Sequence, residues 1–256
     1  MGPIMMHPPL DPGPLDLLYQ PVVERQGHGW ALRLVEGLRR DPTVLESMSI
    51  MGQLDADLAS VPVAAESVRS WGDCLLSLNI SWQYLQVRRY AIGVVKGLAD
   101  SQLLPERLIL ELIESEAPLI GYPGVQPNMQ LLRGCGVKFL LDDVGTGYFR
   151  DPQHVQMTLQ SQPHVNGYPC IIGVKLARQL IAKLDRPRAF SLAATYITVA
   201  INNGASLIIA EGIEPDQPHL LDRVLELEDL CRAHILVQGF VISPKIEACQ
   251  LQDRFV

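Results

Sequence analysis

The stretch Lys138–Tyr148, K-F-L-L-D-D-V-G-T-G-Y, decides the fold of this chain. Its apolar run Phe139–Leu141 is short and ends in two adjacent carboxylates, which a glycine-containing loop follows. Such a run predicts a strand that is buried on both faces, as in a parallel sheet. Asp142 and Asp143 cannot both lie unpaired in a dry core, because an unpaired buried charge is strongly destabilising. We therefore expect a cation at the acidic end of this strand, although an isolated Asp pair would more often cap a helix.

From Leu17 onward, apolar runs alternate with longer amphipathic stretches, which indicates repeated βα units and a parallel sheet. The predicted strands are Leu17–Glu24, Trp30–Val35, Leu75–Ile80, Leu108–Ile113, Lys138–Asp142, Ile171–Leu176, Ser206–Ala210 and Ile235–Val237. The link Arg25–Gly29 between the first two is too short for a crossover helix, so these two should pair antiparallel. Segments such as Gln83–Asp100 and Arg178–Asn202 are long enough for helices. The predicted fold class is α/β: a modified TIM (β/α)8 barrel over residues 17–256, with its first strand antiparallel.

Composition limits the classes of function. A chain of 256 residues with 48% hydrophobic content can bury one large core, and the net charge of −7 argues against a nucleic-acid duplex as partner. The five cysteines are scattered without C-x-x-C spacing, which is typical of reduced thiols in a cytoplasmic protein. No apolar stretch reaches the ~18 to 20 residues of a membrane span. Residues 1–16 are proline-rich, lack the pattern of a secretory signal, and are predicted to form a disordered tail.

Polar side chains stand at or just beyond the C-terminal ends of seven consecutive predicted strands. They are Glu36, Asn79, Glu111 with Glu114, Asp142 with Asp143, Lys175, Glu211 and Gln238. In a barrel these ends meet at one face, where the active sites of this fold are built. Carboxylate and amide oxygens are the ligands that Mg2+ and Mn2+ prefer. Any one of these residues alone would be interpreted as a solvated surface charge, but their ordered recurrence favours a shared cation site.

These motifs resemble those of the EAL family of cyclic di-GMP phosphodiesterases. The matching motifs are Y-Q-P-V-V at Tyr19–Val23, L-N-I-S at Leu78–Ser81, L-E-L-I-E at Leu110–Glu114, D-D-V-G-T-G-Y at Asp142–Tyr148, V-K-L at Val174–Leu176, A-E-G-I-E at Ala210–Glu214 and V-Q-G-F at Val237–Phe240. They follow one another in the expected order, and the resemblance extends from Tyr19 to about Pro244. It implies metal-dependent hydrolysis of cyclic di-GMP to linear pGpG in bacterial second-messenger signalling.

The resemblance also implies a role for each matching residue. The implied ligands of a two-metal site holding Mg2+ or Mn2+ are Glu36, Asn79, Glu111, Asp142, Asp143 and Glu211. The implied catalytic residues are Lys175, which would orient or deprotonate the attacking water, Glu211, and Glu114, which would tie down the loop after Asp143. The implied substrate-binding residues are Gln20, Arg40, which would meet a phosphate, and Gln238. Nearby metals would lower the pKa of Lys175; a structural ion pair with Glu211 is the alternative for this lysine.

The signature motif of the resemblance can be aligned in two ways. Trp30-Ala31-Leu32 keeps the Ala-Leu pair but replaces the glutamate with tryptophan, whereas Glu36-Gly37-Leu38-Arg39-Arg40 keeps the glutamate and adds an arginine four residues later. The interval from Pro21 to Glu36 is long enough for a complete hairpin, whereas the interval from Pro21 to Trp30 is not. We therefore prefer Glu36.

Several segments depart from the pattern of the family. The segment between Arg40 and Leu75 is shorter and lacks the usual proline-containing stretch. Phe149-Arg150 replaces a pair of serines, and Ala177 replaces an aspartate. The run to Ile171 is longer and holds His154 and His164, which we expect to be exposed to solvent in a polar loop. The alternative function is therefore a catalytically weak or inactive module that binds cyclic di-GMP or a protein partner.

The resemblance further implies assembly and control. It predicts a homodimer that forms through the region after the D-D motif, which is enlarged here between Phe149 and Tyr168. With so few residues before the first strand, regulation is expected from a partner protein, from assembly, or from the loop that carries Gly145 and Gly147.

Overall fold

The computed structural model describes residues 16–27, 29–41, 43–46, 48–113 and 117–255. The predicted tail of residues 1–16 therefore lies outside the described residues, Asp16 excepted. Glu114, for which the family resemblance implies a catalytic role, lies outside them as well.

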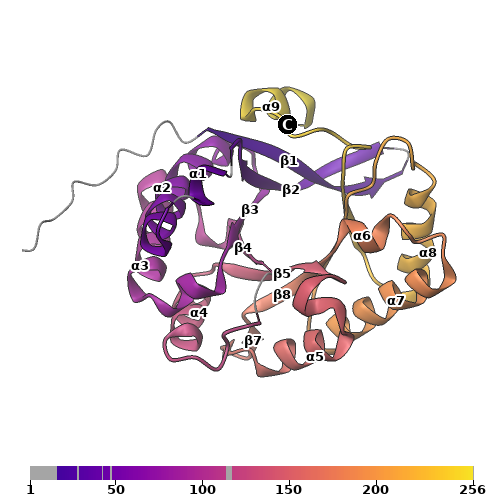
Figure 1. The fold of residues 1–256 in the computed structure, drawn as a ribbon. Coiled ribbons are helices and arrows are strands. Elements are labelled where there is room, and N and C mark those ends of the chain that lie inside the picture. Colours follow the sequence, from indigo (N-terminus) through magenta and orange to yellow (C-terminus); the bar gives the residue numbers. More distant parts are fainter. Residues whose placement is uncertain (1–15, 28, 42, 47, 114–116, 256) are drawn as a thin grey trace, which may run out of the picture.

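A closed barrel of eight strands forms the centre of the molecule, in the order β1-β10-β9-β8-β5-β4-β3-β2 (Figure 1). The barrel strands are β1 (Leu17–Gln26), β2 (Gly29–Arg39), β3 (Leu75–Ile80), β4 (Leu108–Leu112), β5 (Lys138–Val144), β8 (Ile171–Leu176), β9 (Leu207–Glu211) and β10 (Ile235–Gln238). Strand β1 pairs antiparallel with both β2 and β10, and every other neighbouring pair in the barrel is parallel. The predicted modified barrel with a reversed first strand is confirmed.

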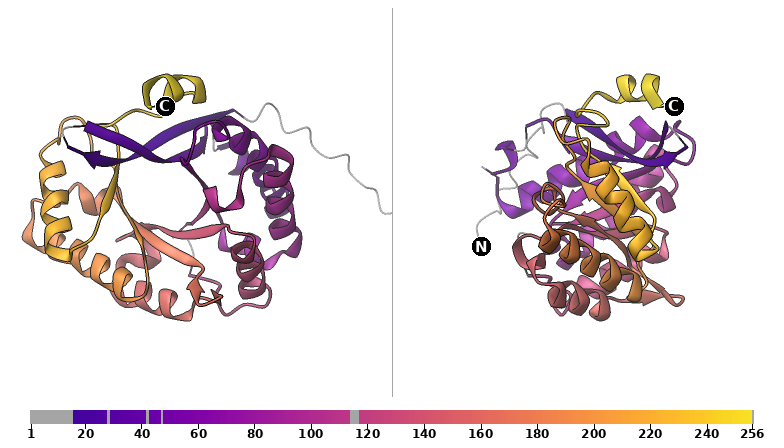
Figure 2. Two further views of the ribbon diagram at one scale, coloured as in Figure 1. Left: turned by 180° about the vertical axis from the view of Figure 1, so that it is seen from behind. Right: turned by 90° about the vertical axis from the view of Figure 1, so that its right-hand side faces the viewer.

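Helices surround the barrel on its outer side (Figures 1 and 2). The α-helices are α1 (Thr43–Glu46), α2 (Ile50–Val68), α3 (Arg88–Ser101), α4 (Val125–Gly134), α5 (Pro152–Ser161), α6 (Arg178–Ile181), α7 (Pro187–Asn202), α8 (Leu220–Cys231) and α9 (Ala248–Phe255). Short 3-10 helices are η1 (Trp82–Gln86), η2 (Pro105–Arg107) and η3 (Gly147–Arg150). None of the helices among the described residues is long and apolar enough to cross a lipid bilayer.

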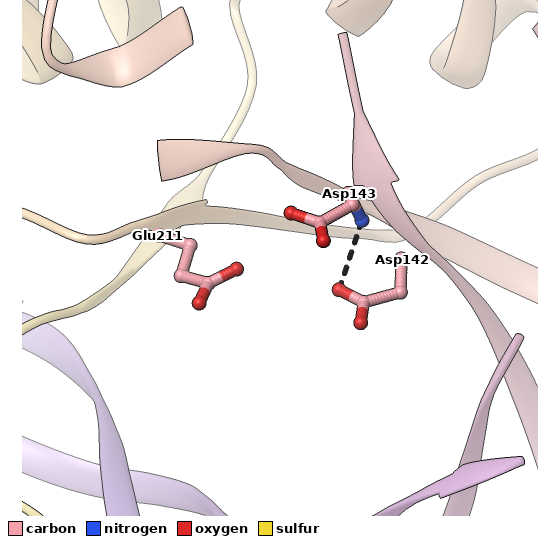
Figure 3. Close-up of side chains that lie close together, drawn as sticks. All are labelled: Asp142, Asp143 and Glu211. Carbon is pink, nitrogen blue, oxygen red and sulfur yellow. Dashed lines mark hydrogen bonds between the residues drawn. The ribbon is translucent and has the colours of Figure 1, made fainter. Parts of the chain in front are cut away.

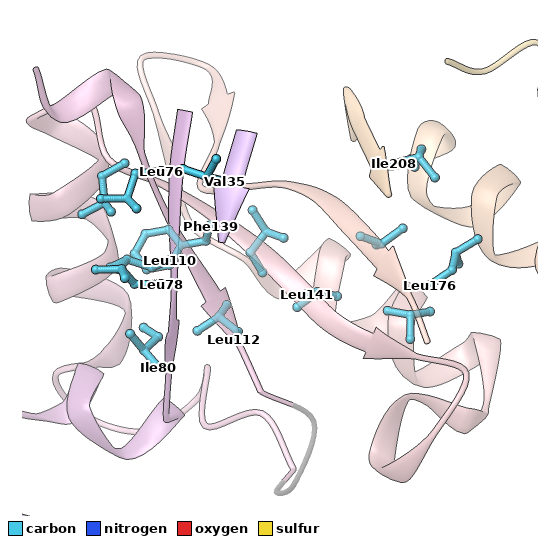
Figure 4. Close-up of a cluster of buried hydrophobic side chains, with 14 of the residues drawn as sticks. Val35, Leu76, Leu78, Ile80, Leu110, Leu112, Phe139, Leu141, Leu176 and Ile208 are labelled. Carbon is cyan, nitrogen blue, oxygen red and sulfur yellow. The ribbon is translucent and has the colours of Figure 1, made fainter. Parts of the chain in front are cut away.

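The main core lies between the outer face of the barrel and these helices. Leu76, Leu78 and Ile80 of β3 lie in it, together with Leu110 and Leu112 of β4 (Figure 4). Because side chains alternate across a strand, the residues between them face the inside of the barrel. This alternation leaves every second strand residue for the interior, where the candidate site lies.

A second, smaller apolar cluster fills the inside of the barrel. We call it the apolar layer; it consists of Val22, Leu34, Ile109, Leu140, Ile209 and Leu236. Except for Leu236, each of these side chains is fully buried. Strands β8 and β9 approach so closely here that a Cβ on Gly173 would lie 2.0 Å from the carbonyl oxygen of Leu207. This inward position of β8 therefore accommodates glycine, because it has no Cβ.

Two parts of the structure differ from the sequence-based expectation. Strand β2 continues to Arg39, so Glu36 lies inside the strand and not after it. The run after Tyr148 is not an irregular loop but contains helix α5 and a ribbon of β6 (His164–Val165) with β7 (Tyr168–Pro169). The sequence carries a signal for the start of α5, because aspartate is a common helix-capping residue. In the structure Asp151 accepts a hydrogen bond from the Gln153 amide at 2.9 Å.

The expectation of two solvent-exposed histidines in this run is wrong for one of them. His164 is exposed, but His154 lies on α5 and is half-buried. Its ring stacks on Tyr148, with 4.3 Å between the ring centroids, and its Nδ1 lies 2.9 Å from the Tyr148 carbonyl oxygen. His154 therefore has a packing role on the outside of the barrel.

Candidate functional site

A ring of polar side chains lies inside the barrel, next to the apolar layer. We call it the polar ring; its members are Gln20, Glu36, Asn79, Glu111, Asp142, Lys175, Glu211 and Gln238. Each stands two residues from an apolar or small residue of the same strand: Val22, Leu34, Ser77, Ile109, Leu140, Gly173, Ile209 and Leu236, respectively. Because β1 runs in the opposite direction, Gln20 precedes its apolar partner, whereas the other seven follow theirs. Strand periodicity and the single reversed strand thus bring all eight to the same end of the barrel.

Lys175 lies within the polar ring and touches four carboxylates. Its Nζ is 3.0 Å from Glu36 Oε2 and 3.0 Å from Glu111 Oε2. It is also 3.5 Å from Asp142 Oδ1 and 3.6 Å from Glu211 Oε2. The predicted ion pair between Lys175 and Glu211 is therefore present, but the lysine lies closer to the carboxylates of β2 and β4.

Four carboxylates face one lysine in this cluster, and burial and neighbouring charges shift their pKa values. Burial by itself would lower the pKa of the Lys175 ammonium, but the surrounding carboxylates raise that pKa well above its usual range. Burial raises the pKa of Glu111 to about 8, and the charge of Lys175 opposes the shift. The pKa values of Asp142 and Glu211 are also raised by burial and also opposed by Lys175. The ring therefore favours additional positive charge.

Glu36 is held in place from three sides. Its Oε1 accepts a hydrogen bond from Asn79 Nδ2 at 2.6 Å, and its Oε2 accepts one from Gln238 Nε2 at 2.7 Å as well as one from Lys175. Burial opposes its ionisation, but the charge of Lys175 and these hydrogen bonds outweigh burial and lower the pKa of Glu36. Glu36 is therefore a fixed carboxylate in the arrangement that the structure shows.

Three oxygen atoms of the ring are buried without a hydrogen-bond partner among the described residues: Asn79 Oδ1, Glu111 Oε1 and Gln238 Oε1. A buried acceptor without a partner is destabilising, and native structures contain few of them. All three belong to carboxylate or amide groups, which are the ligand types that hard divalent cations take. The residues present therefore fit a metal ion.

Asp142, Asp143 and Glu211 form a second group of potential ligands (Figure 3). One oxygen of each carboxylate lies within 4.8 Å of the others. Asp142 Oδ1 accepts a hydrogen bond from the Asp143 amide at 2.9 Å. Asp143 itself has a φ of 50°, a left-handed conformation that is uncommon outside glycine and clusters at functional sites. The end of β5 thus turns abruptly and places two consecutive carboxylates near Glu211.

Two hollows open beside the ring. The first has a volume of about 160 Å³ and is lined by Gln20, Glu36, Leu38, Arg178, Glu211, Gly212, Glu214, Gly239, Phe240 and Lys245. The second has a volume of about 590 Å³, and Asn79, Tyr84 and Lys245 are among the residues that line it. Lys245 thus borders both hollows, and ring residues reach into each.

The structure also places the remaining residues that the sequence singled out. Trp30 lies on β2 opposite Arg25, six residues before Glu36, and lines a different hollow with residues of α8. Of the two alignments of the signature motif, the one with Glu36 is therefore the one that brings a residue into the ring. Arg40 forms ion pairs with Asp16 and Glu247 and is absent from the described linings of both hollows beside the ring.

Sequence reasoning missed Arg178, Phe240 and Lys245. Arg178 forms an ion pair with Glu214 at 2.9 Å, and the Phe240 side chain is exposed at the edge of the first hollow. A signal was present for two of them, since Arg178 follows the strand of Lys175 by two residues and Phe240 follows Gln238 by two.

Comparisons with known proteins agree with this fold. A family model described as the EAL domain matches residues 13–244. The phosphodiesterase PaMucR, solved in complex with c-di-GMP, is 21% identical with a TM-score of 0.73, over 92% of this chain and 98% of that chain. The EAL domain of Mycobacterium smegmatis DcpA is 22% identical with a TM-score of 0.72, over 96% of this chain and 97% of that chain.

A third solved structure is Klebsiella pneumoniae BlrP1 in a complex with calcium and cy-diGMP. It is 20% identical with a TM-score of 0.73, over 95% of this chain and 59% of that chain. At these identities the likeness to solved structures establishes the fold. No protein with a curated function matches the sequence.

Proposed function

The chain belongs to the EAL domain family, and from this premise we propose that it hydrolyses cyclic di-GMP to linear pGpG at the polar ring, using two divalent cations, Mg2+ or Mn2+. The observation that carries the proposal is the ring itself. Four carboxylates surround Lys175 within 3.6 Å, while three buried oxygens next to them have no partner in the described part of the chain. Such an arrangement is unfavourable for folding alone but suits a site that holds cations.

The ligand oxygens divide into two groups that share one residue. Glu36, Asn79, Glu111 and Asp142 would hold one ion, and Asp142 with Asp143 and Glu211 would hold the other. Bound cations of this kind polarise phosphate oxygens and lower the pKa of a water molecule toward neutrality. Gln238 would complete the second side, directly or through water.

Lys175 would orient the attacking water. Its ammonium lies 3.5 Å from Asp142 and 3.6 Å from Glu211, which belong to the group around the second ion. A donor in that position can hold the oxygen of a water molecule near both carboxylates. The same lysine donates to Glu36 and Glu111, so it also keeps the first group of ligands together.

The two hollows would hold the dinucleotide. Arg178 and Lys245 would meet phosphate oxygens, since both cations line the first hollow beside Glu36 and Glu211. The exposed ring of Phe240 offers a surface on which a guanine base can stack. Gln20 lies 3.4 Å from Gln238 and would fix the polar edge of the ligand. Arg40 would reach a phosphate only by leaving Asp16 and Glu247.

The direct test is turnover of cyclic di-GMP by the purified full chain. We expect pGpG to accumulate with Mg2+ or Mn2+, as measured by chromatography of the nucleotides, and to vanish in a chelator. Asp142→Asn should abolish it, whereas Asp222→Asn, which changes the same group on the exposed surface of α8, should not. Absence of pGpG with both metals would contradict the proposal.

A second candidate is a module of the same family that binds cyclic di-GMP or a protein without turning the nucleotide over. The observation that favours it is Arg40, which is engaged with Asp16 and Glu247 at a distance from the ring. Calorimetric binding of the dinucleotide in Ca2+ without any pGpG in Mg2+ or Mn2+ would support this candidate. Absence of both binding and turnover would leave a role in protein interaction.

Assembly is a separate proposal. We expect a homodimer in which the segment between Phe149 and Tyr168, now seen as η3, α5 and the β6-β7 ribbon, lies at the interface. Met157 and Tyr168 in this segment are large apolar side chains with more than half of their surface exposed. Sedimentation velocity at micromolar concentration measures it, and a monomer would contradict it. Sedimentation velocity of complexes isolated from cells would test whether a partner protein is bound.

A further inference from the structure

A basic hollow lies between the loop after β5 and the start of α7, outside the polar ring. It has a volume of about 620 Å³. Its walls carry four cationic side chains, Arg150, Lys183, Arg186 and Arg188, together with the apolar side chains of Leu180 and Leu192. Helices α6 and α7, which contribute to it, lie on the same side of the barrel (Figure 1). A concave space of this size is within the range of small-molecule sites.

The four cations of this basic hollow are available to a ligand. Their side chains are exposed, and in the described part of the chain none of them takes part in a side-chain hydrogen bond or an ion pair. The residues that line the hollow include no carboxylate among those described. Four like charges converge in a protein of net charge −7 and repel one another. A bound anion would reduce this repulsion.

The nearest acidic residues in the sequence are occupied elsewhere. Asp151 follows Arg150, but its carboxylate caps α5 through the Gln153 amide. Asp185 precedes Arg186, but its Oδ2 lies 2.8 Å from His219 Nε2. Among the described residues, neither carboxylate forms an ion pair with a cation of the hollow.

Two further features match an organic phosphate. The start of α7 faces the hollow through Arg188 and Ala189, with Pro187 in its first position and no acidic residue in its first turn. The amides of a first helical turn lack partners within the helix and favour phosphate oxygens. Leu180 and Leu192 supply an apolar wall that inorganic ions would not use.

We propose that the basic hollow binds a small organic phosphate, whose phosphate groups contact the four cations and whose apolar part packs against Leu180 and Leu192. An occupant would also touch Gly145 and Thr146, which belong to the loop that follows Asp143. The proposal does not rest on the proposed hydrolysis, because the basic hollow shares no residue with the polar ring or with the two hollows beside it.

Calorimetric titration with ADP and with inorganic pyrophosphate, in a chelator, tests the proposal on the full chain. Without metal the acidic ring repels both probes, and the variants of the basic hollow distinguish binding there from binding at Arg178 and Lys245 beside the ring. We expect ADP to bind more tightly than pyrophosphate because only ADP reaches the apolar wall. Lys183→Ala and Arg188→Ala should each weaken ADP binding roughly tenfold, as expected for the loss of one charge-assisted hydrogen bond.

The matched control is Lys96→Ala, which removes the same charge from an exposed position of α3 and should leave affinity unchanged. Lys183→Arg should retain binding because it keeps the charge. Circular dichroism checks that each variant is folded. Absence of ADP binding at millimolar concentration would overturn the proposal. An equal loss of ADP affinity in Lys96→Ala and Lys183→Ala would overturn it too, because it would indicate a general charge effect. Equal affinity for ADP and pyrophosphate would overturn the inference that the ligand has an apolar part that packs against Leu180 and Leu192.

Discussion

Leu140 and Asp142 lie two residues apart on β5 and face the same interior, but one belongs to the apolar layer and the other to the polar ring. The apolar layer stabilises the fold by removing hydrocarbon surface from water, at about 25 cal/mol per Å². The polar ring gathers four carboxylates around one lysine and leaves three buried oxygens without partners among the described residues. The same strands therefore supply both a rigid support and a charged site that the support holds together.

Lys175→Met should have the largest effect on stability, because it leaves Glu36 and Glu111 buried without their cation. Removing one partner of a buried ion pair typically costs about 3–5 kcal/mol. We expect a loss of this size in chelator, measured by urea unfolding followed by circular dichroism. Lys96→Met, which makes the same change on the exposed surface of α3, should change stability by less than about 0.5 kcal/mol.

The same variant distinguishes a charge effect from a packing effect. Added Mn2+ should restore more stability to Lys175→Met than it adds to the unmodified chain, because a bound cation replaces the missing positive charge. A variant that stays equally unstable with and without Mn2+ would show that added positive charge does not restore stability, which would contradict a charge effect.

Leu140→Ala should test the apolar layer. The Leu140 side chain is fully buried, and its truncation would leave a cavity, for which about 2–5 kcal/mol is typical. We expect a loss of about 3 kcal/mol in urea unfolding. Metal affinity, measured by calorimetry well below the unfolding midpoint, should stay within a few-fold. Leu230→Ala on the exposed face of α8 is the control, and a large loss of metal affinity in Leu140→Ala would show that the two layers are not separable.

Metal addition should stabilise the polar ring itself. A ligand that binds only the folded state adds about 2.7 kcal/mol at one hundred times its dissociation constant. We expect Mn2+ to raise the thermal unfolding midpoint of the unmodified chain, and chelator to reverse the rise. Asp142→Asn should reduce this gain sharply because Asp142 belongs to both proposed groups of ligands. An unchanged midpoint in saturating Mn2+ would count against a metal site in the ring.

Asp143→Gly should have the smallest effect on stability and the opposite sign. A φ of 50° strains an aspartate but not a glycine, and relief of that strain is worth about 1 kcal/mol. Asp143→Asn is the control, because it also removes the charge but keeps a Cβ at the same φ. The glycine variant should therefore be more stable than the asparagine variant in urea unfolding, while both lose metal-dependent turnover. Equal stability of the two variants would show that the turn is not strained.

Much of the fold could be read from the sequence because apolar runs and their separation are local properties. Strands β3 and β8 begin and end at the predicted residues, and the short link after β1 correctly indicated the reversed strand. The predicted β2 ends too early, because a glutamate that faces a polar barrel interior has the same local pattern as one that ends a strand. The helix after Tyr148 is not predicted because its residues are mostly polar, although Asp151 is a residue type that caps helices.

The eight strands and their acidic ends can be predicted from the sequence, since hydrophobic burial and a period of two residues depend on neighbours along the chain. Which polar groups meet depends on the closed barrel. Barrel closure places Lys175 against Glu36 and Glu111, far away in sequence, and it leaves Arg40 with Asp16 and Glu247. Such contacts depend on strand register and on side-chain directions across the whole ring, and no local pattern encodes them.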